Sequence, residues 1–172
     1  GFPVVMKVVS NDILHKTEAG GVVVGVKSAT DARRAYNDIC KNAAAYDKSA
    51  TVIGVQVQKM QPADQEVIIG AVTDPSFGKL VAFGLGGILV EVMKDITFRL
   101  APASRADANS MINGIQASEV LRGVRGKAGI DRGAIATIIQ NVSKLVSDFP
   151  EISELDLNPV FARAKGASAV DV

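Results

Sequence analysis

The sequence has little of several features that define common protein classes. Its 172 residues include one cysteine, Cys40, and no tryptophan. A single cysteine excludes a disulfide within the chain, which fits a reducing compartment such as the cytoplasm. No apolar run reaches the roughly 18–20 residues that a membrane span needs, and the first residues lack the charged leader of a signal peptide. We therefore expect a cytoplasmic protein with no membrane partner.

An excess of charge of either sign is absent as well. Lys and Arg total 19 against 18 for Asp and Glu, so the net charge is +1. Such a balance gives no electrostatic footprint for nucleic acid. Apolar residues make up 48% of the chain, enough for a core, but only 5% are aromatic, so aliphatic side chains must fill it. Both ends lie in strand-like runs, which favours a piece of a longer polypeptide.

Apolar periodicity predicts an α+β fold. The expected strands are 3–9, 22–26, 51–60, 66–71, 96–100, 154–162 and 168–172, and the expected helices are 30–46, 104–113, 117–121 and 131–147. Thr30 is the expected cap of the first helix, with Tyr36 and Cys40 on its apolar face. No strand is predicted in the glycine-punctuated stretch at 74–88. The pattern divides near residues 60–65, which predicts a small lobe over 1–60 and a larger one over 61–172.

The last two predicted strands bring oxygen-bearing side chains together. Alternation places Glu154, Asp156 and Asn158 on one face. A four-residue loop at 163–166 then sets Asn158 opposite Asp171, with Cβ atoms about 4.5–5.5 Å apart. Mg²⁺ prefers hard oxygen ligands, often one or two carboxylates plus substrate phosphates. The pair is therefore a candidate metal site, although a solvated sheet face is the more frequent outcome of such a pattern.

Two cationic or titratable side chains stand out near the N-terminus. Lys7 lies within an apolar strand, where it either extends to the edge of a sheet or neutralises phosphate oxygens. His15 is the only histidine and lies in a loop that ends at Gly20 and Gly21. Glycines allow an anion to approach the backbone closely, and neutral imidazole can act as a nucleophile. A lone loop histidine is, however, more often structural or merely exposed.

Several segments in a fixed order carry a family resemblance. They are 3–7, 10–22, 66–70, 74–78, 83–91 with Asp95 and 98–102, 121–126 and 155–160. Together they strongly resemble the ATP-grasp domain of NDP-forming (ADP-forming) acyl-CoA synthetases, with succinyl-CoA synthetase β subunits as more distant relatives. The resemblance implies an ATP-grasp fold of two lobes with nucleotide between them, lacking an N-terminal part of the fold.

The resemblance also assigns nucleotide-binding roles. Lys7 is similar to the ATP-grasp lysine that contacts nucleotide phosphates. Gln58, Lys59 and Met60 lie where the family's interlobe hinge lines the adenine pocket, and Glu66 opens the next strand near the expected ribose. The implied cofactors are ATP or ADP and Mg²⁺.

Catalytic and metal-binding roles follow from the same resemblance. Asn158 and Asp171 match the family's magnesium-binding pair, in agreement with the hairpin geometry. His15 matches a histidine that resembles a phosphate-relay residue. Glu91, Asp95 and Arg99 belong to the family's active-site segment, without an assigned step.

The implied activity is that of an acid–thiol ligase, which converts acyl-CoA, ADP and phosphate to acid, CoA and ATP. This chain would supply the transfer between a phosphohistidine and ADP. Its implied partner is a CoA-binding domain or subunit that carries the main phosphohistidine, within an oligomer. One alternative is a non-catalytic acyl-CoA-synthetase-like sensing module of a protein lysine acetyltransferase. Another is a purely structural subunit fragment.

Overall fold

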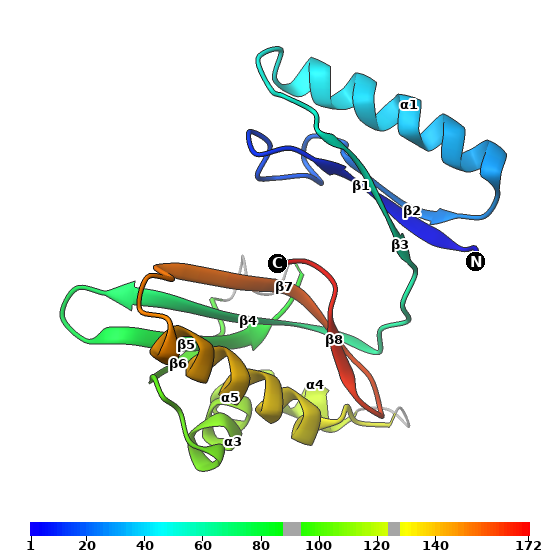
Figure 1. The fold of residues 1–172 in the computed structure, drawn as a ribbon. Helices are drawn as coiled ribbons and strands as arrows, with labels where there is room; N and C mark the ends of the chain where they lie inside the picture. The colour runs from blue at the N-terminus through cyan, green and yellow to red at the C-terminus, as the bar shows by residue number, and fades with distance from the viewer. Residues whose placement is uncertain (88–93, 124–127) are drawn as a thin grey trace. The chain divides into compact units, whose positions relative to one another are not determined.

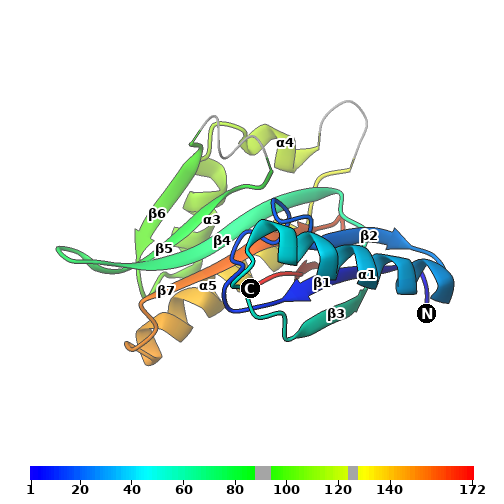
Figure 2. The ribbon, with the colours of Figure 1, turned by 90° about the horizontal axis from the view of Figure 1, so that it is seen from above.

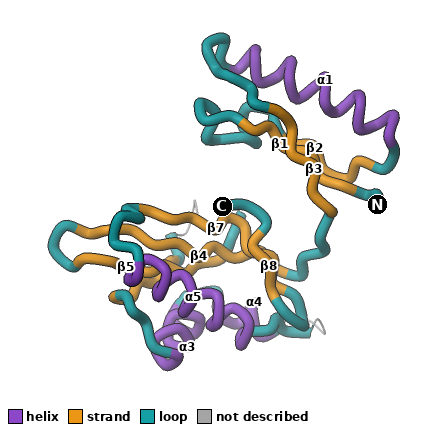
Figure 3. The backbone as a smooth tube through the Cα atoms, viewed as in Figure 1, coloured by secondary structure: helices purple, strands orange, loops and turns teal. Residues whose placement is uncertain are grey.

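The computed structural model describes residues 1–87, 94–123 and 128–172. The chain divides into two compact units, Gly1–Gln61 and Pro62–Val172. The boundary expected from the sequence falls one residue earlier, between 60 and 61. Each unit has its own antiparallel sheet and its own helices, as Figure 3 shows by colour, so the chain has the predicted α+β character.

The first unit is a three-stranded sheet covered by one helix. The strand order is β2-β1-β3, so β1 is central. The strands are β1 (Val4–Val9), β2 (Val22–Val26) and β3 (Gly54–Lys59). The helix α1 (Ala29–Tyr46) runs along one face of this sheet (Figures 1 and 2).

The helix α1 begins where a side chain satisfies its free backbone donors. The Ser28 side-chain oxygen accepts a hydrogen bond from Asp31 N at 3.1 Å. The predicted cap at Thr30 is therefore wrong by two residues, because Ser28 is the N-cap and Thr30 lies inside the first turn of the helix. Every fourth residue of α1 packs onto the sheet: Ala35, Ile39 and Ala43 are buried. Tyr36, expected on the apolar face, is half exposed, and Cys40 is only partly buried.

The second unit is a five-stranded sheet in the order β6-β5-β4-β7-β8. Its strands are β4 (Gln65–Asp74), β5 (Gly78–Leu85), β6 (Ile96–Leu100), β7 (Glu154–Ala162) and β8 (Ala167–Ala169). Its helices are α3 (Arg105–Gly114), α4 (Ser118–Arg122) and α5 (Arg132–Asp148). Figure 1 shows α3 and α5 on the same side of the sheet.

The strand β5 was missed by the sequence analysis. It crosses the glycine-punctuated stretch and pairs with β4 from Asp74↔Gly78 to Val67↔Leu85. The alternation is present, because Val81, Phe83 and Leu85 are all buried against the helices. Small residues on the opposite face, including Gly84, hide this period when the sequence is scanned for apolar alternation.

The core of the second unit lies between the sheet and its helices. Members of this core come from β4, β5, β7, α3 and α5. The other face of the sheet carries exposed apolar side chains near β6, with Phe98 48% and Leu100 58% exposed. Among the described helices, none is long and apolar enough to cross a membrane.

Candidate functional site

Lys7 lies on the central strand of the first unit, not at its edge. It stands between Val22 of β2 and Gln56 of β3 and is only 8% exposed. Because its neighbours Met6 and Val8 pack toward α1, alternation directs Lys7 to the opposite face of the sheet. Lys7 therefore places its positive charge on the face of the sheet that α1 does not cover.

Gln58 and Lys59 end β3, and Met60 follows them shortly before the boundary between the units. Gln58 is partly buried, whereas Lys59 and Met60 are exposed. Met60 N donates to Pro3 O at 3.3 Å, so the end of β3 stays attached to the start of the chain. The segment therefore leads directly into the boundary between the units, and the adenine role stays a prediction.

His15 is exposed at the surface of a loop whose ends are fixed. Thr51 N donates to Asp12 Oδ2 at 2.8 Å, and Asn42 Nδ2 donates to Gly20 O at 3.1 Å. Gly20 has φ +61°, a conformation that favours glycine. The His15 backbone oxygen accepts from Ala19 N within the loop. The imidazole is thus presented to solvent from an ordered loop.

Glu66 lies beside a small polar pocket of about 270 Å³ in the second unit. The pocket is lined by Ala63, Asp64, Gln65, Glu66 and Gly86. Gly86 N donates to Glu66 O at 2.8 Å, and a Cβ on Gly86 would lie 3.0 Å from the Glu66 Cβ. A larger residue at position 86 would therefore push the two segments apart by a few tenths of an ångström or more.

The β7–β8 hairpin has the register that the sequence predicts. Val160 pairs with Ala169 and Ala162 pairs with Ala167, which leaves a four-residue turn at 163–166. Val170 N donates to Pro159 O at 3.1 Å, which extends the same register past the end of β8. One further step would place Asn158 opposite Asp171, and their approach stays a prediction.

Two details of the hairpin differ from the prediction. The strand β8 ends at Ala169, not at 172, so Asp171 lies beyond the paired region. Strict alternation also breaks in β7, because Leu157 and Val160 are both buried against the helices. The pairing of β7 with β4 shifts by one residue between these two positions, as a β-bulge requires.

Asp156 lies beside Asn158 on the exposed face of β7. Partial burial raises the pKa of the Asp156 carboxyl above its usual range; a hydrogen bond with the Asn158 side chain opposes this rise, and the nearby Glu154 charge adds to it. Gly70 lies opposite Asp156 across the strands, and a Cβ there would be 3.0 Å from Leu155 O. Asp156 and Asn158 thus form one contiguous set of oxygen atoms on the face that lacks helices.

Two aspartates that the sequence analysis did not single out hold the hairpin turn. Asp131 Oδ2 accepts from Gly166 N at 3.0 Å, and its backbone N donates to Arg163 O at 2.7 Å. Asp64 Oδ2 accepts from Ala164 N at 2.9 Å. For Asp131, the signal available in the sequence was an aspartate at the start of a helix. Such an aspartate predicts a helix cap but not a second hydrogen-bond partner in the hairpin turn.

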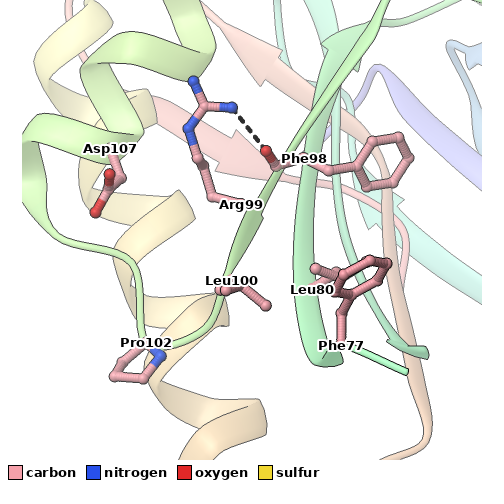
Figure 4. A pocket seen from close by; sticks show the side chains of 7 residues that line it. All are labelled: Phe77, Leu80, Phe98, Arg99, Leu100, Pro102 and Asp107. Carbon is pink, nitrogen blue, oxygen red and sulfur yellow. Dashed lines mark hydrogen bonds between the residues drawn. The ribbon is translucent and has the colours of Figure 1, made fainter. Parts of the chain in front are cut away.

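Arg99 lies on the helix side of the sheet, away from Asp156. It pairs with Val81, whose side chain is buried beneath the helices. Its guanidinium donates to Phe98 O at 2.7 Å and to Ser110 Oγ at 2.7 Å. Figure 4 shows Arg99 and Asp107 on one side of β6 and Phe98 on the other, around a pocket of about 490 Å³. The structure does not bring Arg99 together with Asn158, and its catalytic role stays a prediction.

The remaining members of the predicted active-site segment are placed differently. Asp95 is buried and accepts from Gln116 N at 2.7 Å and Ala117 N at 2.9 Å, so it anchors the turn before α4. Glu91 lies outside the described residues. Within the described ranges, no group of three or more His, Cys, Asp or Glu side chains is placed to hold a metal ion. A metal here would need ligands from a bound molecule, as Mg²⁺ commonly takes from phosphates.

Comparisons with known proteins agree with this fold. A family model described as an ATP-grasp domain matches residues 1–172. The beta subunit of acetate–CoA ligase [ADP-forming] I from Pyrococcus furiosus is 47% identical over 171 residues, covering 99% of this chain and 74% of that subunit. The 4-hydroxybutyrate–CoA ligase [ADP-forming] from Nitrosopumilus maritimus is 45% identical over 166 residues, and the match spans only 24% of its length.

Two solved structures are similar to this chain in both fold and sequence. The dinucleotide-forming acetyl-coenzyme A synthetase 1 of Ca. Korarchaeum cryptofilum, bound to coenzyme A, Ca-AMPCP and HgCl⁺, matches with a TM-score of 0.96 and 43% identity, over 99% of this chain and 75% of that one. A second structure of that enzyme contains coenzyme A and Mg-AMPPCP, with its phosphohistidine segment pointing towards the nucleotide-binding site; its TM-score is 0.85 at 42% identity, over 99% and 75% of the two chains.

These matches identify the two units, one a sheet with a single helix and the other a sheet with helices on one face, as an ATP-grasp fold. Within that class, the chain belongs to the ATP-grasp domain family that includes the beta subunits of ADP-forming acetate–CoA ligases.

Proposed function

We propose that this chain is the nucleotide-binding part of an ADP-forming acyl-CoA synthetase. In this role it transfers phosphate between a phosphohistidine and ADP in the presence of Mg²⁺. The observation that carries the proposal is the match along 99% of the chain to a synthetase structure that contains a nucleotide analogue and a divalent cation. CoA binding and the main phosphohistidine are assigned to a partner domain or subunit.

The proposed chemistry asks for positioning and charge neutralisation rather than for a strong acid or base. Lys7 supplies a fixed positive charge on the helix-free face of the first unit. Glu66 and its pocket offer polar contacts to a ribose. His15, exposed on an anchored loop, accepts and returns the phosphoryl group as a relay.

The oxygen atoms of the β7–β8 hairpin fit a magnesium site. Asn158 supplies an amide oxygen, Asp171 a carboxylate, and Asp156 adjoins Asn158 through a hydrogen bond. These are hard ligands of the type that Mg²⁺ takes when phosphates complete its coordination. When bound, the ion would neutralise charge on the phosphates. The chain's own share is to hold Asn158 and Asp171 in one register.

The sensing-module alternative has weaker support. The relatives named above are ligases, at 45–47% identity over nearly the whole chain. The candidate ligands Asn158 and Asp171 and the candidate relay His15 are all present. A silent copy of the domain would not need to keep these residues.

Calorimetry on the full-length protein tests the proposal. We expect ADP and ATP to bind in the presence of Mg²⁺ and Lys7→Ala to weaken this binding by tenfold or more, because a phosphate contact is lost. Lys41→Ala removes an exposed lysine from α1 and serves as the matched control. Equal nucleotide affinity in wild type and Lys7→Ala would remove Lys7 from the site, and no binding at all would contradict the proposed function.

A further inference from the structure

The turn of the β7–β8 hairpin is held by carboxylates from two distant parts of the chain. Asp131 lies 35 residues before Gly166, whose backbone N donates to its Oδ2 at 3.0 Å. Asp64 lies 100 residues before Ala164, whose backbone N donates to its Oδ2 at 2.9 Å. A four-residue turn in a hairpin does not need such partners in order to close, so these contacts add a constraint from outside.

Asp131 joins this turn to the start of α5. Its Oδ1 accepts from Ala134 N at 2.9 Å, which makes it the cap of the helix, while Oδ2 serves Gly166. Its backbone N also donates to Arg163 O at 2.7 Å. One residue therefore contacts both ends of the turn, and α5 is packed into the core through Ile135 and Ile139. The turn is thus attached to a helix that packs into the core of the unit.

Asp64 joins the same turn to the first residues of the second unit. Its backbone N donates to Ala162 O at 3.1 Å, and its side chain reaches Ala164. Asp64 also lines the pocket beside Glu66. The wall of that pocket and the hairpin turn are therefore parts of one hydrogen-bonded arrangement.

We infer that Asp131 and Asp64 are positioning residues for the hairpin that carries Asn158 and Asp171. A slip of one residue in an antiparallel pair turns every side chain to the other face. The strand β8 has only three residues, Ala167–Ala169, so its own ladder fixes the register weakly. The two carboxylates fix the turn and thereby keep Asp171 in line with Asn158. The link to metal binding rests on the proposed function, whereas the effect on register does not.

Substitutions at Asp131 separate the two halves of its role. Asparagine caps helices as well as aspartate does. Ala134 N and Gly166 N donate to different oxygens of Asp131, and asparagine has only one acceptor oxygen, so Asp131→Asn cannot keep both contacts in this geometry. We therefore expect Asp131→Asn to keep α5 and to release the turn. At the other position, Asp64→Ala removes the contact to Ala164, and Asp64→Asn restores it with its amide oxygen.

Hydrogen exchange measured by mass spectrometry on the full-length protein, without metal or nucleotide, tests the register. In Asp131→Asn and Asp64→Ala we expect about tenfold faster exchange in the peptide over 159–172, because a hydrogen bond to a charged group is lost. Asp64→Asn should exchange as the wild type does. Ser104→Ala, which removes the cap of α3, is the control for loss of a helix cap elsewhere in the unit. Unchanged exchange at 159–172 in Asp131→Asn, or an equal rise in Ser104→Ala, overturns the inference.

A magnesium titration of nucleotide binding tests the link to function. We expect Asp131→Asn and Asp64→Ala to need several times more Mg²⁺ for half-maximal ADP binding, with Asp64→Asn close to wild type. Faster exchange without any change in Mg²⁺ dependence would reduce both aspartates to a structural role and overturn the inference. If the wild type itself binds no nucleotide, the proposed function fails. The exchange data still test whether the two aspartates fix the register of the β7–β8 hairpin.

Discussion

At the scale of single residues, the candidate metal site depends most on Asp171, which supplies its carboxylate. It lies beyond the last pair of β8 and is partly exposed, so it contributes little to the core. We predict that Asp171→Ala abolishes phosphoryl transfer in the complete enzyme while the midpoint of thermal unfolding moves by no more than a few degrees. The measurement pairs radiolabelled phosphate transfer with a melting curve.

Asp148→Ala is a suitable comparison for Asp171→Ala. Its carboxylate forms an exposed ion pair with Lys144 at 2.7 Å, and such pairs contribute little to stability. We expect this variant to keep both activity and fold. Retained transfer in Asp171→Ala would contradict the metal site and the catalytic interpretation that depends on it.

The lowered pKa of Asp131 makes the stability of the fold depend on pH. Hydrogen bonds from the backbone of Gly166 and then of Ala134 hold the pKa of Asp131 below its usual range. A folded-state pKa below the unfolded one stabilises the fold at pH values above about 4, the ordinary pKa of aspartate, and this contribution is lost as the pH falls through the folded value.

We therefore predict that the difference in the free energy of unfolding between wild type and Asp131→Asn is largest near pH 6 and shrinks toward pH 3. Urea denaturation at a series of pH values measures it. Asparagine does not titrate, so any part of the acid sensitivity that persists in the variant belongs to other carboxylates, including Asp107 with its own lowered pKa. A difference that stays constant across this range would contradict the role of the Asp131 charge.

At the scale of elements, Gly70 decides how closely β4 and β7 approach. A Cβ added at Gly70 would lie 3.0 Å from Leu155 O, a backbone atom that cannot turn aside. We predict that Gly70→Ala lowers the free energy of unfolding by about 1–3 kcal/mol, as overpacking does, and displaces the neighbouring Asp156. Gly54→Ala in β3 meets no atom within 4 Å and provides the control. Equal stability of the two variants would show that the strands adapt without strain.

The elements also show what periodicity alone can predict. Val22–Val26 and Ile96–Leu100 were predicted to the residue, because β-branched or aromatic residues predominate in both short runs. The strand β5 was missed, since glycines dilute its pattern. The bulge that sets Leu157 and Val160 on one face depends on how β7 pairs with β4, more than 80 residues away in the sequence. Long-range pairing of this kind is invisible to a local scan.

The hairpin that carries the candidate metal ligands was predictable to a similar degree. The register of the hairpin followed from alternation and a four-residue turn, both of which are local. The carboxylates of Asp64 and Asp131 that hold the turn come from elsewhere in the chain. The direction of Arg99 depends on which face of the sheet the helices cover, and no residue near Arg99 specifies that face.

At the scale of the whole molecule, His15 is the residue whose role depends most on other parts of the enzyme. It is exposed, and its loop is attached by Asp12 to Thr51 and by Gly20 to Asn42. A relay histidine must be reachable by a phosphate donor and still return to one place, and an exposed side chain on an anchored loop meets both needs. The main phosphohistidine is assigned to a partner domain or subunit, so the isolated chain has no donor in this scheme.

We predict that His15 is transiently phosphorylated when the complete enzyme turns over with ATP or with acyl-CoA, ADP and phosphate. Rapid quenching at alkaline pH followed by mass spectrometry should find an acid-labile phosphate on the peptide that contains His15. His15→Gln keeps the size and polarity of the side chain but has no nucleophilic ring nitrogen, so we expect it to lower kcat by a hundredfold or more without a comparable change in the affinity for ADP. Leu14→Ala, which alters an exposed neighbour in the same loop, should keep full turnover. Full turnover of His15→Gln with all partners present would show that phosphate reaches ADP without this histidine.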